Sequence, residues 1–404
     1  MGTRNVYEKV AAGGMDVHHK FSQVTMRNEQ GKVVRRERLD HPDRKAMRER
    51  LSQWPKDVPF VMEASFGWGW VADLMKELGL NPVLSNCLKV EQMRKARGDV
   101  KNNKKDADLL SLLPSELTEW WKVWMAPPEV RDMREWMRYR SGLVHISTQT
   151  QNRIHAIFHR HGVFHEFSDL FGTKGRAFLT GLCEDGRTPD VQLPAGALAS
   201  LRGEVRLLDH VRKQLAEVAK NLRGQLHSDD LAKRLDGIPG IGLILSHTLI
   251  AEIGKIERFV NHRHLASYCL LAPRDNDTGE NDPGRPPKGR RIGKCGNRTL
   301  KWALLEAAHG AVRSGGKWRK IFDRYTQGGK KDRNRGYIKV ARELVKVVDV
   351  VWRKGVAYTA TPPTRPKASK RSRAKEFFGS TRSGTGQPSP AMTAAQLQGL
   401  QVSV

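Results

Sequence analysis

The sequence predicts a mixed α/β domain near the N-terminal end, followed by a mainly helical remainder. Between residues 12 and 110, short β-type runs alternate with segments that have helical spacing of apolar residues. Two much longer helical patterns follow, at residues 128–162 and 197–226. Strands that alternate with helices form a sheet with helices on its faces, whereas long helical patterns pack on one another.

The first strands are expected in the runs GMDVHH, FSQVTM and GKVVRRERL, which only turns separate. Such runs form an antiparallel meander. Two more strands are expected in PFVMEAS and NPVLSN, and helices in RKAMRERLSQW and WVADLMKELG, the second of which ends at a glycine. The ribonuclease H-like arrangement is one fold of this kind.

Residues 128–162 contain no internal proline and predict one long helix, with Leu143, Ile146, Ile154, Ile157 and Phe158 on its apolar stripe. A helix of this length fits an arm better than a single domain. Residues 197–226 are expected to be its antiparallel partner, and residues 163–195 a smaller insert. Basic side chains surround the stripe: Arg131, Arg134, Arg138, Arg140, Arg153, His155, His159, Arg160 and His161.

A second unit begins with LDGIPGIGLILSHTLIAEIG at residues 235–254. The PGIG core between two apolar segments is typical of a helix-hairpin-helix, in which the turn at Gly240 and Gly242 lets backbone N–H groups approach a DNA phosphate. The alternative is a plain turn between two helices, because Gly and Pro occur in any such turn.

The net charge of the 404-residue chain is +28, from 71 Lys and Arg against 43 Asp and Glu. Phosphate backbones are the most frequent partners of such an excess of positive charge. No apolar stretch reaches the length that spans a bilayer and no signal peptide opens the chain, so we expect a soluble, cytoplasmic, nucleoid-associated protein without a membrane partner. Four cysteines without CxxC spacing indicate neither a zinc site nor a disulfide framework.

Acidic and amide side chains occur where a metal-dependent nuclease needs them. Asp16 and Glu63 end two apolar β-type runs, and Asn103 and Asp106 lie three residues apart on an expected helix. Carboxylate and amide oxygens bind Mg²⁺, and two such ions can hold the attacking and leaving oxygens of a phosphodiester. The pattern therefore predicts chemistry on nucleic acid.

Seven motifs together resemble the DEDD transposases of bacterial insertion sequences, which are related to the pilin-gene invertase and are described as bridge-RNA-guided recombinases. The motifs are GMDVHHK, VMEAS, KNNKKDA, GIPGIGLILSHTLIAEIG, LASYCLLAP, DTGEN and GRRIGKCGNRTLKWAL. They occur in the family's order and spacing, so the resemblance covers most of residues 12–355.

This resemblance implies four parts. They are a RuvC-like, ribonuclease H-like domain at 12–125, a helical coiled-coil arm with a small insert at 126–230, a mainly α transposase domain with the helix-hairpin-helix at 231–358, and a disordered basic tail at 359–404. It also implies a tetrad at Asp16, Glu63, Asn103 and Asp106 that binds Mg²⁺ or Mn²⁺. The implied partners are DNA, a structured noncoding guide RNA, and further copies of the chain in a dimer or tetramer.

The sequence departs from the family at two site positions. The family has Asp where this chain has Asn103, whose amide oxygen can bind a metal but brings no charge; Asp99 and Asp108 are nearby substitutes, although Asp108 lies on a different helical face from Asp106. The family's nucleophile lies in a Ser-Gly pair that is Thr278-Gly279 here. Thr278 is therefore either a working nucleophile or a mark of lost activity.

Basic residues around Thr278 are suited to phosphate, although a charged loop that contacts only solvent is the alternative. They are Arg274, Arg285, Lys288, Arg290, Arg291, Lys294 and Arg298. Farther on, four aromatic residues lie among basic residues and permit base stacking, with the protein core as the alternative for Tyr325 and also for Trp352. They are Trp318, Phe322, Tyr325 and Tyr337.

Three functions remain open from the sequence. The first is a transposase or site-specific recombinase that cuts and rejoins DNA through a hydroxyl nucleophile and a metal-binding acidic site. The second is a catalytically inactive nucleic-acid-binding relative. The third is a metal-dependent nuclease for branched DNA, in which Thr278 has no role.

Overall fold

The structure is a computed structural model that describes residues 9–98, 103–116, 118–272 and 296–360, without the side chains at positions 103, 104, 226 and 227. The chain divides into a unit at Met1–Tyr358 and a second unit at Thr359–Val404. Nearly all of the second unit, which we expected to be a basic tail, lies outside the described residues. The fold below is that of the first unit.

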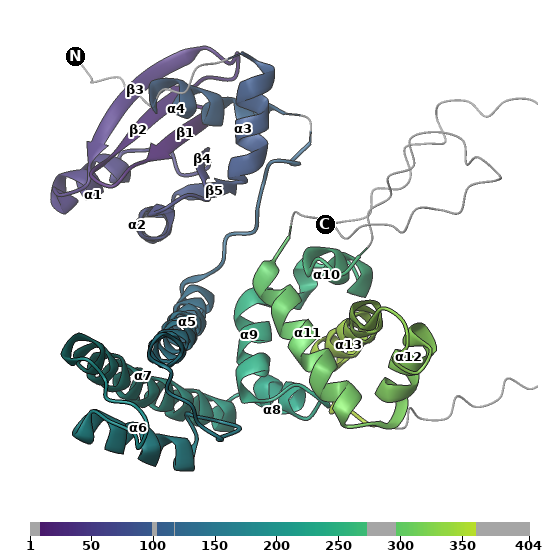
Figure 1. The fold of residues 1–404 in the computed structure, drawn as a ribbon. Coiled ribbons are helices and arrows are strands. Elements are labelled where there is room, and N and C mark those ends of the chain that lie inside the picture. Colours follow the sequence, from purple (N-terminus) through teal and green to yellow (C-terminus); the bar gives the residue numbers. More distant parts are fainter. Residues whose placement is uncertain (1–8, 99–102, 117, 273–295, 361–404) are drawn as a thin grey trace, which may run out of the picture. The chain divides into compact units, whose positions relative to one another are not determined.

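A five-stranded mixed sheet forms the N-terminal part, as predicted (Figure 1). The strands are β1 (Ala12–Val17), β2 (Phe21–Arg27), β3 (Val33–Asp40), β4 (Pro59–Glu63) and β5 (Asn81–Ser85), in the spatial order β3-β2-β1-β4-β5. The first three strands are antiparallel neighbours, which confirms the meander, whereas β4 pairs with β1 and β5 in parallel. Strand β1 therefore lies at the centre, between the antiparallel and parallel halves.

Helices pack on both faces of this sheet because side chains alternate along each strand. Phe60 and Met62 of β4 belong to one apolar cluster, together with α1 (Arg44–Ser52) and α2 (Trp68–Glu77). Val61 between them belongs to a second cluster, together with α3 (Cys87–Ala96), α4 (Asn103–Leu112) and η1 (Leu113–Ser115). Strand β4 is thus buried on both faces, whereas β3 at the edge of the sheet keeps exposed side chains.

Two long helices follow, α5 (Pro128–His161) and α7 (Ala195–Ser228), with α6 (Thr173–Asp185) between them. Tyr139 donates a hydrogen bond to Gln214, and Arg153 forms an ion pair with Glu204, so the sequence numbers run in opposite directions and the two helices are antiparallel, as predicted. The expected stripe on α5 is buried except at one position. Ile146 is 38% exposed, so the apolar stripe is not buried along its whole length.

Basic residues of α5 contact other parts of the protein. Arg131 binds both carboxylate oxygens of Asp73, and Arg134 donates to the backbone oxygens of Ala251 and Glu252. Together with the Arg153 ion pair, these contacts give three arginines of α5 a structural role.

The C-terminal part of the first unit is helical and surrounds one apolar core. Its elements are α8 (Asp230–Asp236), α9 (Leu243–Ile253), η2 (Ile256–Arg258), α10 (His262–Tyr268), α11 (Arg298–Arg313), α12 (Gly316–Thr326) and α13 (Arg333–Lys354). Trp318 and Phe322 are each 3% exposed in this core, so the expectation that they stack on bases was wrong. Tyr337 also packs against the core, whereas Tyr325 is 39% exposed.

The turn between α8 and α9 packs tightly on α11. Gly240 has φ +85°, and a Cβ atom there would lie 2.1 Å from the backbone oxygen of Ala307. Gly240 is therefore required for close packing of this turn, which is the ordinary role of glycine between two helices. Gly242 is different, because it is exposed, directly precedes α9 as its N-cap and has no atom within 4 Å of the place of a Cβ.

Among the residues that the structure describes, no helix is both long and apolar enough to cross a bilayer. Cys87, Cys183 and Cys269 are free thiols. Cys295 lies outside the described residues.

Candidate active site

Asp16 and Glu63 lie at the ends of two neighbouring parallel strands. Met15 of β1 is paired with Met62 of β4, so the next residue of each strand is acidic. Gly14 is paired with Val61 one step earlier, and side chains two residues apart share a face. Asp16 therefore shares a face with Gly14, and Glu63 shares the same face with Val61.

Helix α4 covers this face at a very short distance from β1. A Cβ atom on Gly14 would lie 2.2 Å from the backbone oxygen of Ala107 and 2.2 Å from the backbone nitrogen of Ser111. Only glycine permits this approach of helix to strand. Asp106 precedes Ala107 in the first turn of α4, so it lies on the helix that packs against the face of Asp16 and Glu63.

A single guanidinium links two of these carboxylates electrostatically. The pKa of Arg94 on α3 is raised above its ordinary value, first by its hydrogen bond to Glu91, and the carboxylates of Asp106 and Glu63 also contribute. Charges interact in this way only at short range in a salt solution. The carboxylates of Glu63 and Asp106 therefore both lie close enough to Arg94 to interact with its charge.

Two further neighbours of the acids, His18 and Cys87, have side chains that can bind a metal or carry a proton. Nε2 of His18 lies 2.9 Å from Oδ2 of Asp16, whose side chain is 19% exposed. Burial raises the pKa of the Cys87 thiol, and the nearby Glu63 carboxylate raises it further. The thiol therefore stays protonated, and Cys87 is a neutral neighbour of Glu63.

The donor types fit a hard divalent cation, since Asp16, Glu63 and Asp106 offer carboxylate oxygens and Arg94 lies where positive charge is favoured. In the described part of the chain, no three His, Cys, Asp or Glu side chains are gathered as a metal site. The side chain of Asn103, the fourth predicted ligand, lies outside the described residues, although its backbone begins α4.

Asp108, the substitute ligand that we considered, is used elsewhere. It accepts hydrogen bonds from Thr25 Oγ1 at 2.7 Å and from Arg36 Nη2 at 2.7 Å. Burial raises the pKa of Asp108, but the hydrogen bonds from Arg36 and Thr25 outweigh it, and the pKa is lowered. Asp108 therefore joins α4 to β2 and β3, which agrees with its expected place on a different face from Asp106.

Most of the predicted nucleic-acid-binding residues lie outside the described residues, as does Thr278. The basic residues that lie outside the described residues are Arg274, Arg285, Lys288, Arg290, Arg291 and Lys294. Arg298 is described and is an exposed first residue of α11. The backbone N–H of Asn297 donates a 2.7 Å hydrogen bond to Tyr268, and Leu271 donates to Ala266, so both described ends of the segment 273–295 are attached to α10.

Sequence reasoning missed two residues of this site. Gly14 had a signal, because a Gly-Gly pair inside an apolar β-type run indicates close approach of another backbone. Arg94 had no signal, because its closeness to Glu63 and Asp106 depends on how α3 and α4 pack.

The comparisons with known proteins agree with this combination of a mixed sheet bearing acidic strand ends and a helical remainder. A family model described as transposase, of the DEDD IS110 type, matches residues 13–162. A second model, described as the transposase IS116/IS110/IS902 family, matches residues 232–323. The first match contains most of β1 and all of β4 and α4, and the second contains most of α8 and all of α9.

Individual relatives come from bacterial insertion elements. The 43.6 kDa protein of insertion element IS110 from Streptomyces coelicolor is 27% identical over 39% of this chain and 37% of its own length. The 44.8 kDa protein of IS116 from Streptomyces clavuligerus is 25% identical over 46% of this chain and 45% of its own length. The transposase for insertion sequence element IS1328 from Yersinia enterocolitica is 24% identical over 73% of this chain and 82% of its own length.

In its fold, its acidic strand ends and its relatives, this chain is similar to one class of protein, the transposases of bacterial insertion sequences. Within this class, the two model matches along different parts of the chain show that it belongs to the DEDD-type IS110 family. The matched part spans less than half of the length of the two Streptomyces relatives, at 37% and 45%.

Proposed function

We propose that this protein is an insertion-sequence transposase, or site-specific recombinase, that cuts and rejoins DNA strands. The observation that carries the proposal is the convergence at one end of the sheet. Asp16 and Glu63 directly follow Met15 and Met62, which are paired between β1 and β4. Helix α4, which carries Asp106, packs at Gly14 on the face of the sheet that Asp16 and Glu63 share. This arrangement supports a site that acidic groups from three separate segments would form together beside one end of the sheet.

The proposed catalytic tetrad is Asp16, Glu63, Asn103 and Asp106. The strand order β3-β2-β1-β4-β5, with β1 antiparallel to β2 and parallel to β4, supports the ribonuclease H-like, RuvC-like assignment of the domain. When bound, Mg²⁺ or Mn²⁺ would neutralise charge on the scissile phosphate and polarise it for attack. The carboxylates would hold the cation, and His18 would hold Asp16 in place.

Thr278 is the proposed nucleophile. Its hydroxyl oxygen would lose a proton, form a bond to phosphorus and displace a sugar oxygen, which would take up a proton in turn. The phospho-threonine would conserve the energy of the broken phosphodiester for rejoining to another strand end. Recombination rather than hydrolysis is the expected outcome.

We assign DNA contacts to exposed and basic groups of the C-terminal part. Gly242 is exposed at the start of α9, where backbone N–H groups suit a phosphate, and this supports a helix-hairpin-helix formed by α8 and α9. Arg298 and the basic residues of segment 273–295 would follow the backbone of the same DNA. Gly240 would act only by shaping the turn against α11.

The proposal also includes partners that follow from the family. We propose a dimer or tetramer in which α5 and α7 form a coiled-coil arm, and a structured noncoding guide RNA that pairs with the DNA. The charge of +28 on the chain supports binding of more than one nucleic acid.

A trapping experiment tests this function. The protein is incubated with Mg²⁺, the noncoding RNA of its element and target DNA, and a covalent protein–DNA adduct is isolated and its attachment site is mapped by mass spectrometry. We expect an adduct at Thr278, none with Thr278→Ala, and restored formation with Thr278→Ser.

Each of the other outcomes points to a specific error. An adduct that persists with Thr278→Ala means that the nucleophile is another residue. Hydrolysed DNA ends that do not depend on Thr278 indicate a metal-dependent nuclease for branched DNA. Shifted DNA without new joints, and without an effect of Mg²⁺, indicates an inactive nucleic-acid-binding relative.

A further inference from the structure

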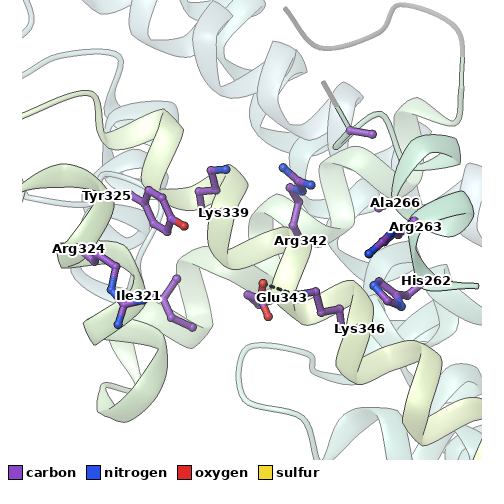
Figure 2. A pocket seen from close by; sticks show the side chains of 11 residues that line it. His262, Arg263, Ala266, Ile321, Arg324, Tyr325, Lys339, Arg342, Glu343 and Lys346 are labelled. Atoms are coloured by element: carbon purple, nitrogen blue, oxygen red, sulfur yellow. Dashed lines mark hydrogen bonds and ion pairs between the residues drawn. The ribbon is translucent and has the colours of Figure 1, made fainter. Parts of the chain in front are cut away.

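A cavity of about 640 Å³ lies between α10, α12 and α13, and none of the residues that line it belongs to β1, β4 or α4. Figure 2 shows Arg324 and Tyr325 of α12 on one side, His262 and Arg263 of α10 on the other, and residues of α13 between them. All these elements belong to the helical C-terminal part. The volume of the cavity lies within the range of sites that bind small molecules or single groups of larger ligands, about 300 to 1,000 Å³.

Positive charge dominates the lining of this α12–α13 cavity. Five side chains carry permanent positive charge, Arg263, Arg324, Lys339, Arg342 and Lys346, against the single carboxylate of Glu343. Glu343 is paired with Lys346 at 2.6 Å. Within the described part of the chain, none of the other four cations has an acidic partner within ion-pair distance.

The cations of α13 repel one another. The pKa of Lys339 is lowered, first by its burial and then by the neighbouring Arg342 and Arg335. Burying like charges side by side costs free energy, and a bound anion offsets that cost. An anionic ligand would therefore stabilise the arrangement that the structure shows.

One wall of the cavity is aromatic. Tyr325 is 39% exposed, and Nζ of Lys339 lies 5.1 Å from the centroid of its ring. Ile321 continues this wall from the preceding turn of α12. A flat ring beside cations suits a ligand that has a planar base and a phosphate, because the base stacks while the phosphate binds the cations.

We propose that the α12–α13 cavity binds an unpaired nucleotide of a polynucleotide strand, with its phosphates on Lys339, Arg342 and Arg324 and its base on Tyr325. The inference rests on the proposed function to the extent that both have nucleic acid as ligand. It adds a binding site that is distinct from the acidic strand ends and specifies the form of the ligand, a single strand.

The shape of the site favours a single strand over a duplex. In a duplex each base is stacked within the helix and is not available to a protein ring, whereas a single strand can turn one base outward. The phosphate and the base must enter the same hollow here, because Lys339 and Tyr325 are in contact. RNA and DNA share this chemistry, so the experiment distinguishes them.

The test measures binding of fluorescently labelled hexanucleotides to the full chain by anisotropy, with RNA, DNA and a hairpin duplex of matched sequence. Hexanucleotides are too short to bridge many basic regions. The double variant Lys339→Gln/Arg342→Gln is compared with Lys320→Gln/Lys354→Gln, which removes equal charge from exposed positions of α12 and α13 outside the cavity.

We expect the cavity variant to weaken single-strand binding about tenfold and to reduce the slope of log affinity against log salt by about 1.4, since two phosphate contacts are lost. The matched control should change affinity by less than about twofold, because it removes only nonspecific attraction. Tyr325→Leu should weaken binding about fivefold, whereas Tyr325→Phe should retain it. The better of the RNA and DNA hexamers identifies the strand.

Equal losses in the cavity and control variants would overturn the proposal, as would tighter binding of the duplex than of either single strand. A second measurement is cross-linking of the wild-type chain to a hexamer that contains 4-thiouridine or 4-thiothymidine. Because it uses only the wild-type chain, it does not depend on whether a variant folds. We expect the cross-link on α12 or α13, and a cross-link found only elsewhere contradicts the site.

This experiment separates the cavity from the proposed function. If the wild-type chain forms the Thr278 adduct while the cavity variant binds hexamers normally, only the cavity assignment is wrong. If the wild-type chain binds hexamers through the cavity but forms no adduct, only the transposase proposal fails.

Discussion

Nη2 of Arg36 donates a 2.7 Å hydrogen bond to Oδ2 of Asp108, across 72 positions of sequence. Asp108 is two residues from Asp106, so a structural carboxylate and a proposed metal ligand occupy different faces of the same helical turn. This difference in role leads to a direct prediction about stability and its dependence on pH.

Asp108→Asn should destabilise the protein by about 1 kcal/mol at pH 7, since Arg36 is half-exposed and solvent reduces the value of its charged hydrogen bond. The folded-state pKa of Asp108 is lowered, so its contribution is fully present above the unfolded pKa of about 4 and is lost as pH falls through the folded value. Urea unfolding of both proteins between pH 7 and pH 3 measures this. A difference that grows as pH falls contradicts the assignment.

The neighbouring position provides the contrast. Asp106→Asn should reduce strand transfer at least about a hundredfold if Asp106 is a metal ligand, while Asp108→Asn retains most of the activity at a temperature where it is folded. Strand-transfer assays on the two variants at equal folded fraction measure this. Equal loss of activity in both would mean that the two residues were assigned the wrong roles.

Gly14→Ala should destabilise the N-terminal sheet by at least about 2 kcal/mol, because the new Cβ would lie 2.2 Å from backbone atoms of α4. The matched control is Gly142→Ala in α5, where nothing lies within 4 Å and alanine favours the helix by about 0.5 to 1 kcal/mol. Thermal unfolding followed by circular dichroism compares them. Unchanged stability of Gly14→Ala would contradict the close packing that positions Asp106.

Asn297→Ala should destabilise the helical C-terminal part by about 2 to 3 kcal/mol. Asn297 Oδ1 caps α11, and its Nδ2 donates a 2.7 Å hydrogen bond to Glu252, which is 5% exposed and would lose a donor. Asn261→Ala removes only a cap, that of α10, and should cost about 1 kcal/mol. Urea unfolding measures both, and equal losses would mean that Glu252 does not need Asn297.

Much of the fold followed from local patterns in the sequence. The alternation of apolar residues around Met15 and Phe60 predicts strands, and the stripe through Leu143 and Ile154 predicts the long helix, because both patterns depend on neighbours in sequence. The structure also agrees that Asp16 and Glu63 occur where strands end. The sequence did not predict the parallel pairing that makes β1 and β4 neighbours.

Residues whose role depends on long-range packing were not predictable. Trp318 and Phe322 lie among basic residues in sequence, but the helical period turns them into the core and leaves Tyr325 exposed. Gly240 has the same local signature whether its turn faces phosphate or another helix, and only its contact with Ala307 distinguishes the two. Arg94 is unremarkable in sequence, although it lies near two acids of the proposed tetrad.

An amide residue, Asn103, occupies the first position of α4. Asn103→Asp adds a charged oxygen to the proposed tetrad, and the number of charged ligands sets affinity for a hard cation. The Mg²⁺ concentration that gives half-maximal strand transfer should fall about tenfold. Asn102→Asp, which adds the same charge one residue earlier, is the matched control and should change it by less than about twofold, since a nearby charge that does not bind the ion acts only through screened attraction. Equal effects of both substitutions would show that added negative charge alone is responsible and would remove Asn103 from the tetrad. Titration calorimetry with Mn²⁺ on the same proteins measures metal binding itself, without DNA.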